Sequence, residues 1–212
     1  MIIENELHYT SKHTFAKLKE ALDRGDKEKV IQMFEQRVKE LYLEPARLLI
    51  EHAKHCKNNN CKNNIGFLFS AGLICVSTID FLGRFYTGCP KGDVGSRFID
   101  WLLSYMQPPF DGYLANKFYK DFRNGLVHEC RIKNGGEFSL SIDNLFVLKR
   151  VDNREYLVVN PEVLLEEIRK GFDKYLKDLR KNNILFEELI NCLKKDFKSD
   201  FSKNGRDDND EG

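Results

Sequence analysis

Apolar residues recur at spacings of three and four along most of this chain, which is the period of an α-helix. Two such stretches begin after side chains that can cap a helix, Ser11 or Thr14 for the first and Asp26 for the second. Pro45 falls inside the second stretch and should kink or divide that helix, because proline lacks a backbone donor and clashes with the preceding turn. The Asn-rich segment 57–64 predicts a loop, and the first ten residues, which show no period, predict a loose arm.

The segment 65–86 is the most apolar in the chain and predicts a buried helix at the centre of the fold. Its continuous apolar run, 65–76, has about 12 residues, whereas a helix that spans a membrane needs about 20. Asp80 and Arg84 follow this run one turn apart. These features favour a core helix, so we expect no membrane partner.

Further helices are predicted on both sides of a short β-like segment. The apolar spacing indicates a helix over 97–106, and Asp111 can cap the next one. Alternation of apolar and polar residues near 137–159 predicts a small β-hairpin or three-stranded insert. Asn160, followed by proline, then begins a helix whose apolar stripe continues to Phe197.

The pattern predicts one mainly α domain over 1–200, a helical bundle with the small β insert, and a disordered polar tail over 201–212. No internal repeat and no strong linker divides the chain. With 42% apolar and 32% charged residues, the composition excludes a disordered chain, a collagen-like repeat and a polytopic membrane protein. A chain of this length can build a stable core without a metal or a disulfide.

Charge and cysteine usage narrow the class of protein. The 34 basic and 33 acidic residues give a formal net charge of +1, so any contact with nucleic acid must come from a local patch rather than from bulk charge. The six cysteines are irregularly spaced and no signal peptide opens the chain. We therefore expect free thiols and a cytoplasmic location.

The segment 119–131, with the sequence YKDFRNGLVHECR, carries the most distinctive chemistry. It places Arg123, Asn124 and His128 near the end of an amphipathic helix, with four residues between the arginine and the histidine. A guanidinium group binds two phosphate oxygens and stays charged, and an imidazole can move protons near neutral pH. Side chains five positions apart on an ideal helix diverge by about 140°, so these two should converge only if the helix unwinds near Gly125 or if a second subunit completes the site.

This arrangement resembles the signature of the HEPN (higher eukaryotes and prokaryotes nucleotide-binding) superfamily, in which an arginine, often followed by a polar residue, precedes a histidine by four to six residues. The context fits, because an apolar helix with Asp80 and a helix around Trp101 precede the motif. The resemblance covers roughly 65–128. Many members of this superfamily are metal-independent endoribonucleases of toxin–antitoxin or antiviral defence systems, and two protomers pair so that both motifs line one cleft.

The resemblance implies a HEPN-like helical bundle and a role for each residue of the motif. Arg123 would hold the scissile phosphate, and His128 would act as the base on the 2′-hydroxyl or the acid on the leaving oxygen. Asn124 would orient one of these groups or bond the RNA, and the product would be a 2′,3′-cyclic phosphate. The implied partners are RNA, a second copy of the chain, and a cognate antitoxin or another defence component. Without these roles, Arg123 would simply pair with a carboxylate and His128 would cap the end of the helix.

Neighbouring residues extend this hypothesis, each with a plainer alternative. Asp80 could orient Arg123, or it could form an ion pair with Arg84 one turn away. Tyr119 could stack on a base, or it could pack in an interface. A local excess of positive charge could attract an RNA backbone, or it could be a solvated helix face. The further members of this basic group are Lys117, Lys120, Arg131 and Lys133.

One cluster of potential metal ligands stands outside this motif. His52, His55, Cys56 and Cys61 are residue types that bind zinc, but no paired CxxC and no HExxH accompanies them. A polar helix end followed by a loop is the simpler interpretation. The chain also lacks a Walker loop, a Rossmann glycine set and a nucleophile elbow. We therefore expect no metal and no cofactor.

The sequence thus favours a metal-independent endoribonuclease of defence or toxin type, acting as a homodimer with a composite Arg/His site. The alternative is a non-catalytic dimeric HEPN-like scaffold or RNA-binding module with the same fold. The two hypotheses differ in whether Arg123 and His128 from two chains face a common, open and positive cleft.

Overall fold

The computed structural model describes residues 2–3, 6–58, 64–89 and 92–203, and its fold is mainly α with a small β-sheet, as the hydrophobic pattern predicts. The helices are α1 (Phe15–Asp23), α2 (Lys27–Val38), α3 (Glu44–Asn58), α4 (Asn64–Tyr86), α5 (Val94–Tyr105), α6 (Gly112–Phe118), α7 (Asn124–Glu129), α8 (Pro161–Lys181), α9 (Asn183–Asp196) and α10 (Lys198–Lys203). Two π-helical turns, η1 (Lys39–Leu43) and η2 (Tyr119–Arg123), join α2 to α3 and α6 to α7. The strands are β1 (Ile2–Ile3), β2 (Glu6–Leu7), β3 (Glu137–Phe138), β4 (Phe146–Val151) and β5 (Arg154–Val159).

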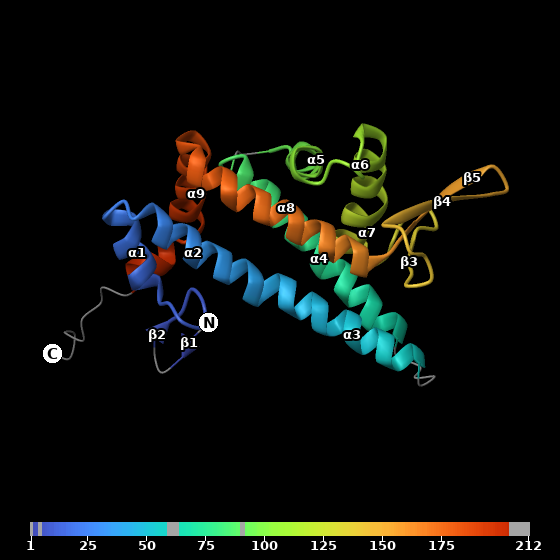
Figure 1. Cartoon of the computed structure of the whole chain (residues 1–212), viewed down its shortest axis with the longest axis horizontal. Helices are drawn as coiled ribbons and strands as arrows, with labels where there is room; N and C mark the ends of the chain where they lie inside the picture. The colour runs from blue at the N-terminus through green and yellow to red at the C-terminus, as the bar shows by residue number, and fades with distance from the viewer. Residues whose placement is uncertain (1, 4–5, 59–63, 90–91, 204–212) are drawn as a thin grey trace.

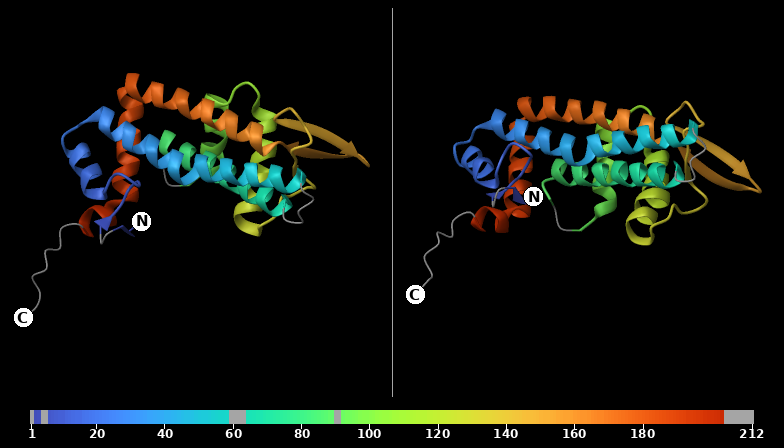
Figure 2. Two further views of the ribbon diagram at one scale, coloured as in Figure 1. Left: turned by 60° about the horizontal axis from the view of Figure 1, so that its bottom comes forward. Right: turned by 90° about the horizontal axis from the view of Figure 1, so that it is seen from below.

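Helix α4 lies at the centre of the bundle and packs against α3, α5, α8 and α9. Figures 1 and 2 show α2 and α3 as one long rod beside α4, with α8 running alongside, while α1 and α9 close one end and the β-sheet projects from the other. Val76, Ile79 and Leu82 of α4 are fully buried in the core. Within the described residues, Ile65–Tyr86 is the one helix long and apolar enough to cross a membrane, with a mean hydropathy of 2.0 and 39% of its most apolar window buried. The prediction of a core helix is confirmed for one face of α4, and the opposite face is partly exposed.

Predicted cap residues start four of the helices. The side chains of Thr14, Asp26, Asp111 and Asn160 each accept a hydrogen bond from a backbone N–H of the first turn that follows. These bonds satisfy donors that a helix leaves free at its N-terminus. Helix α5 begins at Val94, earlier than predicted, because the preceding aspartate caps it in the same way.

Pro45 follows a π-helical turn that separates α2 from α3, so the α-helix is interrupted before the proline, as predicted, but the chain stays helical. The turn η1 is wider than an α-helical turn: the Glu44 N–H bonds to the Lys39 carbonyl, five residues back. This widening directly before Pro45 accommodates a residue that has no N–H and whose ring would otherwise press on the preceding turn.

The N-terminal segment is fixed to the bundle where it is described, so the prediction of a loose arm is wrong there. Tyr9 is fully buried, and the Arg37 guanidinium lies 4.6 Å from the centroid of its ring. Arg37 also donates a hydrogen bond to the Tyr9 carbonyl. The backbone N–H of Ser11 donates to a carboxylate oxygen of Glu40 at 2.8 Å.

The β insert is a three-stranded sheet in the order β3–β5–β4, with β3 parallel and β4 antiparallel to β5. Val151 pairs with Arg154 across the tip of the hairpin that β4 and β5 form. The two turn residues, Asp152 and Asn153, have φ angles of 49° and 60°, as a two-residue turn with this twist requires.

The apolar stripe after Asn160 belongs to two helices, so the prediction of one helix to Phe197 is wrong. Asn182 has an extended backbone, with φ −110° and ψ 110°, and its Oδ1 accepts hydrogen bonds from the N–H groups of Ile184 and Leu185. The residue therefore ends α8 and caps α9.

Two predicted irregular segments are only partly described. The ends of the predicted loop 57–64 belong to α3 and α4, and residues 59–63 lie outside the described residues. Helix α10 continues into the predicted tail as far as Lys203, and 204–212 lie outside the described residues.

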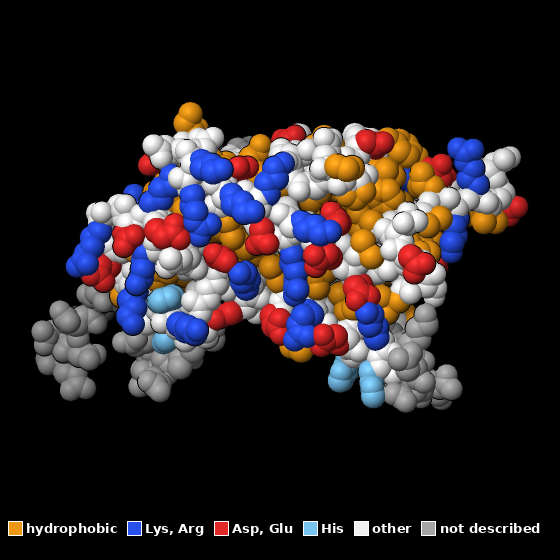
Figure 3. All heavy atoms as spheres, viewed as in Figure 1, with side chains coloured by type: hydrophobic (Ala, Val, Ile, Leu, Met, Phe, Trp, Pro, Cys, Tyr) orange, Lys and Arg blue, Asp and Glu red, His pale blue; other side chains and the backbone are white. Residues whose placement is uncertain are grey.

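On the face in Figure 3, basic and acidic side chains are interspersed over α2, α3 and α8, while hydrophobic side chains gather near α6 and the sheet.

Cys89 and Cys192 form a disulfide with a Cα–Cα distance of 5.2 Å, so the expectation of free thiols throughout is wrong. The bond joins the end of α4 to α9 across 103 residues of sequence, a separation that carries no signal in the spacing of the cysteines. Among the described residues, Cys75 and Cys130 are free thiols. Burial raises the pKa of the Cys75 thiol to about 12.

Candidate functional site

A π-helical turn carries the arginine of the Arg/His motif. Helix α6, the turn η2 and helix α7 are continuous, and the Asn124 N–H bonds to the Tyr119 carbonyl across the wide turn. Turns of this kind are frequent at functional sites. Arg123, at the end of the turn, is buried, whereas His128 on α7 is exposed.

The Arg123 guanidinium holds the predicted side chains in one cluster. Its Nη1 lies 3.0 Å from Nε2 of His128 and 3.4 Å from Oδ1 of Asn124. Its Nη2 donates to Oδ2 of Asp80 at 3.0 Å. Because a guanidinium group only donates, Nε2 of His128 is the acceptor in this contact. The Nε atom of Arg123 is buried and has no hydrogen-bond partner among the described residues.

One chain brings Arg123 and His128 together, directly after the widened turn η2. Helix α7 stays α-helical through Gly125, and no second subunit is involved in the contact. Asn124 and His128 are four positions apart and share a face, and the long Arg123 side chain reaches across to them. The angle between two positions on a helix gives only the directions in which their side chains start. It does not include the length of an arginine side chain, which here is sufficient to reach His128.

Asp80 pairs with Arg123 rather than with Arg84. The Arg84 guanidinium forms an ion pair with Asp196 and donates from Nε to Sγ of Cys89 at 3.1 Å. The two charges one turn apart on α4 therefore bind different segments, the turn η2 and helix α9. Of the two sequence hypotheses for Asp80, the geometry agrees with the one in which it orients Arg123.

Gly125 allows the chain to fold back under α7. Cys130 ends the helix in a left-handed conformation with φ 51°, and the Arg131 N–H bonds to the Gly125 carbonyl at 3.3 Å. A Cβ atom on Gly125 would lie 2.3 Å from the Arg131 carbonyl oxygen, which is a backbone atom. Glycine is therefore required at position 125, because the backbone of the segment that follows α7 passes so close to it.

Lys117, predicted to contact RNA, is engaged within the protein. It forms a 2.9 Å ion pair with Asp121 that is almost wholly buried, and its Nζ donates to the Glu155 carbonyl at 3.3 Å. Asp121 also accepts a hydrogen bond from the Asn134 side chain at 2.5 Å. This pair joins the motif helix to the β-sheet and holds the turn after α7.

The other basic residues predicted to contact RNA differ in whether they form ion pairs within the protein. Arg131 and Lys133 both pair with Glu129, at 2.6 Å and 2.5 Å, and the hydrogen bond from Lys133 lowers the pKa of that carboxyl group. Lys120 is exposed and takes part in none of the ion pairs found among the described residues. The basic group is thus largely neutralised, with Lys120 the most open of its lysines.

Tyr119 packs inside the protein. Its ring lies 5.5 Å from that of Phe98, and its atoms are so close to Gly95 that a Cβ there would lie 3.0 Å away. The Arg123 guanidinium lies 5.8 Å from the ring centroid. The ring therefore packs against residues of its own chain, beside the buried arginine.

The candidate zinc ligands do not form a cluster in the described residues. His52 packs its ring edge-on against Phe67, and Cys61 lies outside the described residues. The group with metal-ligand proximity that the described residues contain is Cys89, Cys192 and Asp196, in which the two sulfurs are bonded to each other.

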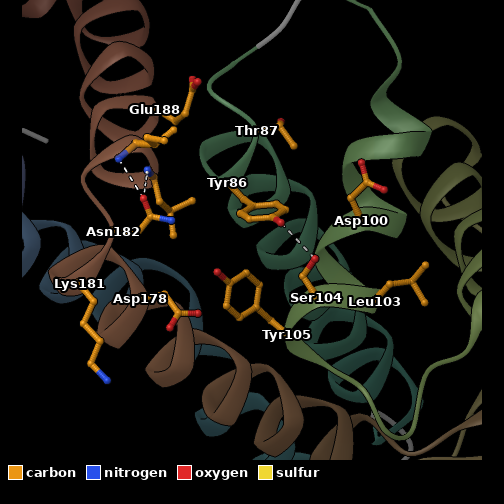
Figure 4. Close-up of a pocket in the computed structure, with 12 residues that line it drawn as sticks. Tyr86, Thr87, Asp100, Leu103, Ser104, Tyr105, Asp178, Lys181, Asn182 and Glu188 are labelled. Carbon is orange, nitrogen blue, oxygen red and sulfur yellow. Dashed lines mark hydrogen bonds between the residues drawn. The ribbon is translucent and has the colours of Figure 1, made fainter.

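An open cavity of about 660 Å³ lies apart from the Arg123 cluster, and no motif in the sequence indicates it. Figure 4 shows that side chains from α4, α5, α8 and α9 surround it, among them Tyr86, Tyr105 and Asp178. These residues are distant in sequence and share no motif, so only the packing of the helices brings them together.

No family model, curated protein or solved structure matches this chain. The likeness to HEPN domains therefore stays a prediction from Arg123, Asn124 and His128 and from the helices around them.

Proposed function

We propose that this chain is a metal-independent endoribonuclease of defence or toxin type, which cleaves RNA as a homodimer through Arg123 and His128. The observation that carries the proposal is the 3.0 Å contact between a buried guanidinium and an exposed imidazole. Asp80 holds the guanidinium from behind and leaves Nη1 directed at the surface histidine.

The proposed reaction uses the 2′-hydroxyl of RNA as the nucleophile. A phosphate that binds Nη1 of Arg123 replaces the imidazole there and frees Nε2 of His128 to accept the 2′-hydroxyl proton. The bond from the 2′-oxygen to phosphorus forms, the bond to the 5′-oxygen breaks, and that oxygen takes up a proton. The products are a 2′,3′-cyclic phosphate and a 5′-hydroxyl. The guanidinium stabilises the charge that develops on the phosphate oxygens.

A dimer would supply the second proton-transfer group, which a single Arg123 cluster lacks. The reaction needs a base and an acid, and the cluster has one imidazole, so His128 of the partner subunit would provide the second. Val127, next to His128 on α7, is 42% exposed, which leaves an apolar contact surface beside the histidine. A two-fold axis near α7 would bring two such surfaces together.

The chemistry of the donor set favours a reaction without a metal ion. The groups at the centre of the cluster are a guanidinium, an amide and one imidazole. The one carboxylate, Asp80, is bonded to the guanidinium, which would repel a cation. Divalent ions in nucleases are usually held by several carboxylates.

One observation favours the alternative, a non-catalytic scaffold or RNA-binding module. Arg123 is only 8% exposed, and both of its terminal nitrogens already have partners. A guanidinium in this state is well suited to hold α4 and α7 together. The two functions therefore differ in whether RNA can reach Nη1.

Incubation of the purified protein with total RNA in the presence of EDTA tests the proposal. We expect cleavage, with a 2′,3′-cyclic phosphate on the 5′ fragment. A substrate with deoxyribose at the scissile nucleotide should resist cleavage, because it lacks the nucleophile. Intact RNA in every condition would support the alternative function instead.

A further inference from the structure

The open cavity beside α4 has an aromatic wall and an acidic rim. Tyr86 and Tyr105 form the wall, with ring centroids 5.4 Å apart and planes at 90°. Asp100 of α5, Asp178 of α8 and Glu188 of α9 surround them, as Figure 4 shows. The lining residues include none of the Arg123 cluster, so the cavity is separate from the site described above.

The carboxylates of the rim lack cationic partners. None of the ion pairs formed by the described residues includes Asp100, Asp178 or Glu188, although most exposed carboxylates of the helices are paired in this way. Lys181 is the one basic side chain in the lining. Burial, and after it the Asp178 carboxylate, raises the pKa of Tyr105. The cavity thus carries an excess of negative charge.

The tyrosine wall suits a cation. The Lys174 ammonium already lies 5.4 Å from the centroid of Tyr105, and its Nζ donates to the Ser104 carbonyl at 3.0 Å, not to a carboxylate of the rim. Ser104 also donates from its hydroxyl to the Tyr86 hydroxyl at 3.2 Å, which fixes that ring. Aromatic faces attract ammonium groups, and the attraction grows where water is excluded.

A buried hydroxyl behind the wall has no hydrogen bond. Tyr175 is fully buried and its hydroxyl has no partner among the described residues. The neighbours that, after burial itself, raise its pKa are Tyr105, Tyr86 and Glu188, all of which line the cavity. Its ring lies 5.4 Å from that of Tyr105 and 6.3 Å from that of Tyr86, so Tyr175 supports the aromatic wall from the core side.

We propose that this cavity binds a small aliphatic amine with two or more ammonium groups. Three carboxylates on three different helices are too widely distributed for one ammonium, and a volume of about 660 Å³ is far larger than a metal ion needs. The carbon chain of such an amine would lie against Tyr86 and Tyr105 while its ammonium groups reach the rim. This inference is independent of the proposed nuclease function.

Isothermal titration calorimetry of the full chain with spermidine tests this proposal. We expect saturable binding to the wild type, and Asp178→Asn and Glu188→Gln should each raise the Kd about tenfold, the equivalent of one lost charged contact. Asp173→Asn and Glu187→Gln, matched changes of exposed carboxylates on the same two helices, should leave the Kd unchanged. Tyr86→Leu should weaken binding several-fold through loss of the aromatic face.

Several results would overturn the proposal. The absence of any heat of binding of spermidine to the wild type would do this directly. An equal increase in Kd for the rim variants and for the matched control variants would also contradict the proposal. Binding of MgCl₂ at the same site with equal affinity would show that the rim attracts any cation. If Asp178→Asn or Glu188→Gln fails to fold by circular dichroism, Asp100→Asn provides the same test on α5.

Discussion

Arg123 and Asp80 lie 43 residues apart in sequence and are joined by a 3.0 Å bond between Nη2 and Oδ2. The side chains are 9% and 27% exposed, so the pair is shielded from water without being wholly buried. It fixes the end of the motif helix on the central helix α4. The position of the guanidinium relative to His128 therefore depends on a carboxylate from another helix.

Asp80→Ala should lower the free energy of unfolding by about 1–3 kcal/mol, because it leaves the Arg123 guanidinium shielded and without its charged partner. In a double-mutant cycle, Asp80→Ala combined with Arg123→Met should cost less than the sum of the two single changes. Denaturant unfolding of the four proteins measures this coupling. Asp23→Ala, which removes a well-exposed pair with Lys19, is the control and should change stability by less than about 1 kcal/mol. Additive effects at Asp80 and Arg123 would mean that the pair contributes nothing.

Gly125→Ala should be strongly destabilising, by about 1–3 kcal/mol, because the new Cβ would lie 2.3 Å from a backbone oxygen. Gly66→Ala is the matched control, since this helical glycine has no atom within 4 Å of an added Cβ. That change should leave stability unchanged or raise it by up to about 1 kcal/mol, as alanine favours a helix. Similar melting temperatures for the two variants would contradict the observed return of the chain under α7.

Reduction of the Cys89–Cys192 disulfide should lower stability by about 2–5 kcal/mol, because the bond closes a loop of 103 residues. Unfolding with and without dithiothreitol measures the effect. The double variant Cys89→Ser/Cys192→Ser should be insensitive to the reductant, whereas Cys130→Ser, at an exposed free thiol, should remain sensitive. An identical unfolding midpoint for reduced and oxidised wild type would rule out the bond in solution.

The proposed nuclease should be a dimer at micromolar concentration. Light scattering should give twice the 24.8 kDa mass of the chain. Val127→Glu should shift the mass toward the monomer if α7 lies near the two-fold axis, while Leu48→Glu, at an exposed leucine on α3, should not. A strictly monomeric wild type would remove the second imidazole that the mechanism needs.

Much of the fold could be predicted because local chemistry determines it. Thr14, Asp26 and Asn160 cap their helices through side-chain bonds to the next turn, and such bonds depend on neighbours in sequence. The break between α8 and α9 at Asn182 could not be predicted, because the apolar period continues through this position without interruption. The form of the interruption at Pro45 could not be predicted, because a π-helical turn accommodates a proline that an α-helical turn cannot.

The candidate site could be predicted only in part, because its residues depend on tertiary contacts. The motif indicates Arg123 and His128, and a helical wheel cannot show that a long arginine reaches the histidine. The choice of Arg123 over Arg84 as the partner of Asp80 is made by the packing of α7 against α4. The burial of Lys117 could not be predicted, because it depends on the contact with the Glu155 carbonyl of β5.

The central claim is tested most directly by the initial rate of RNA cleavage by His128→Ala compared with that of wild type, both in EDTA. His128 is exposed, so its replacement should leave the fold intact, and loss of a general acid or base should lower the rate by about 10²–10⁴-fold. Arg123→Lys should lose a comparable amount, Asn124→Ala should lose less, and His52→Ala, an exposed histidine on α3, should lose nothing. If His128→Ala cleaves RNA as fast as wild type, the proposed mechanism is wrong.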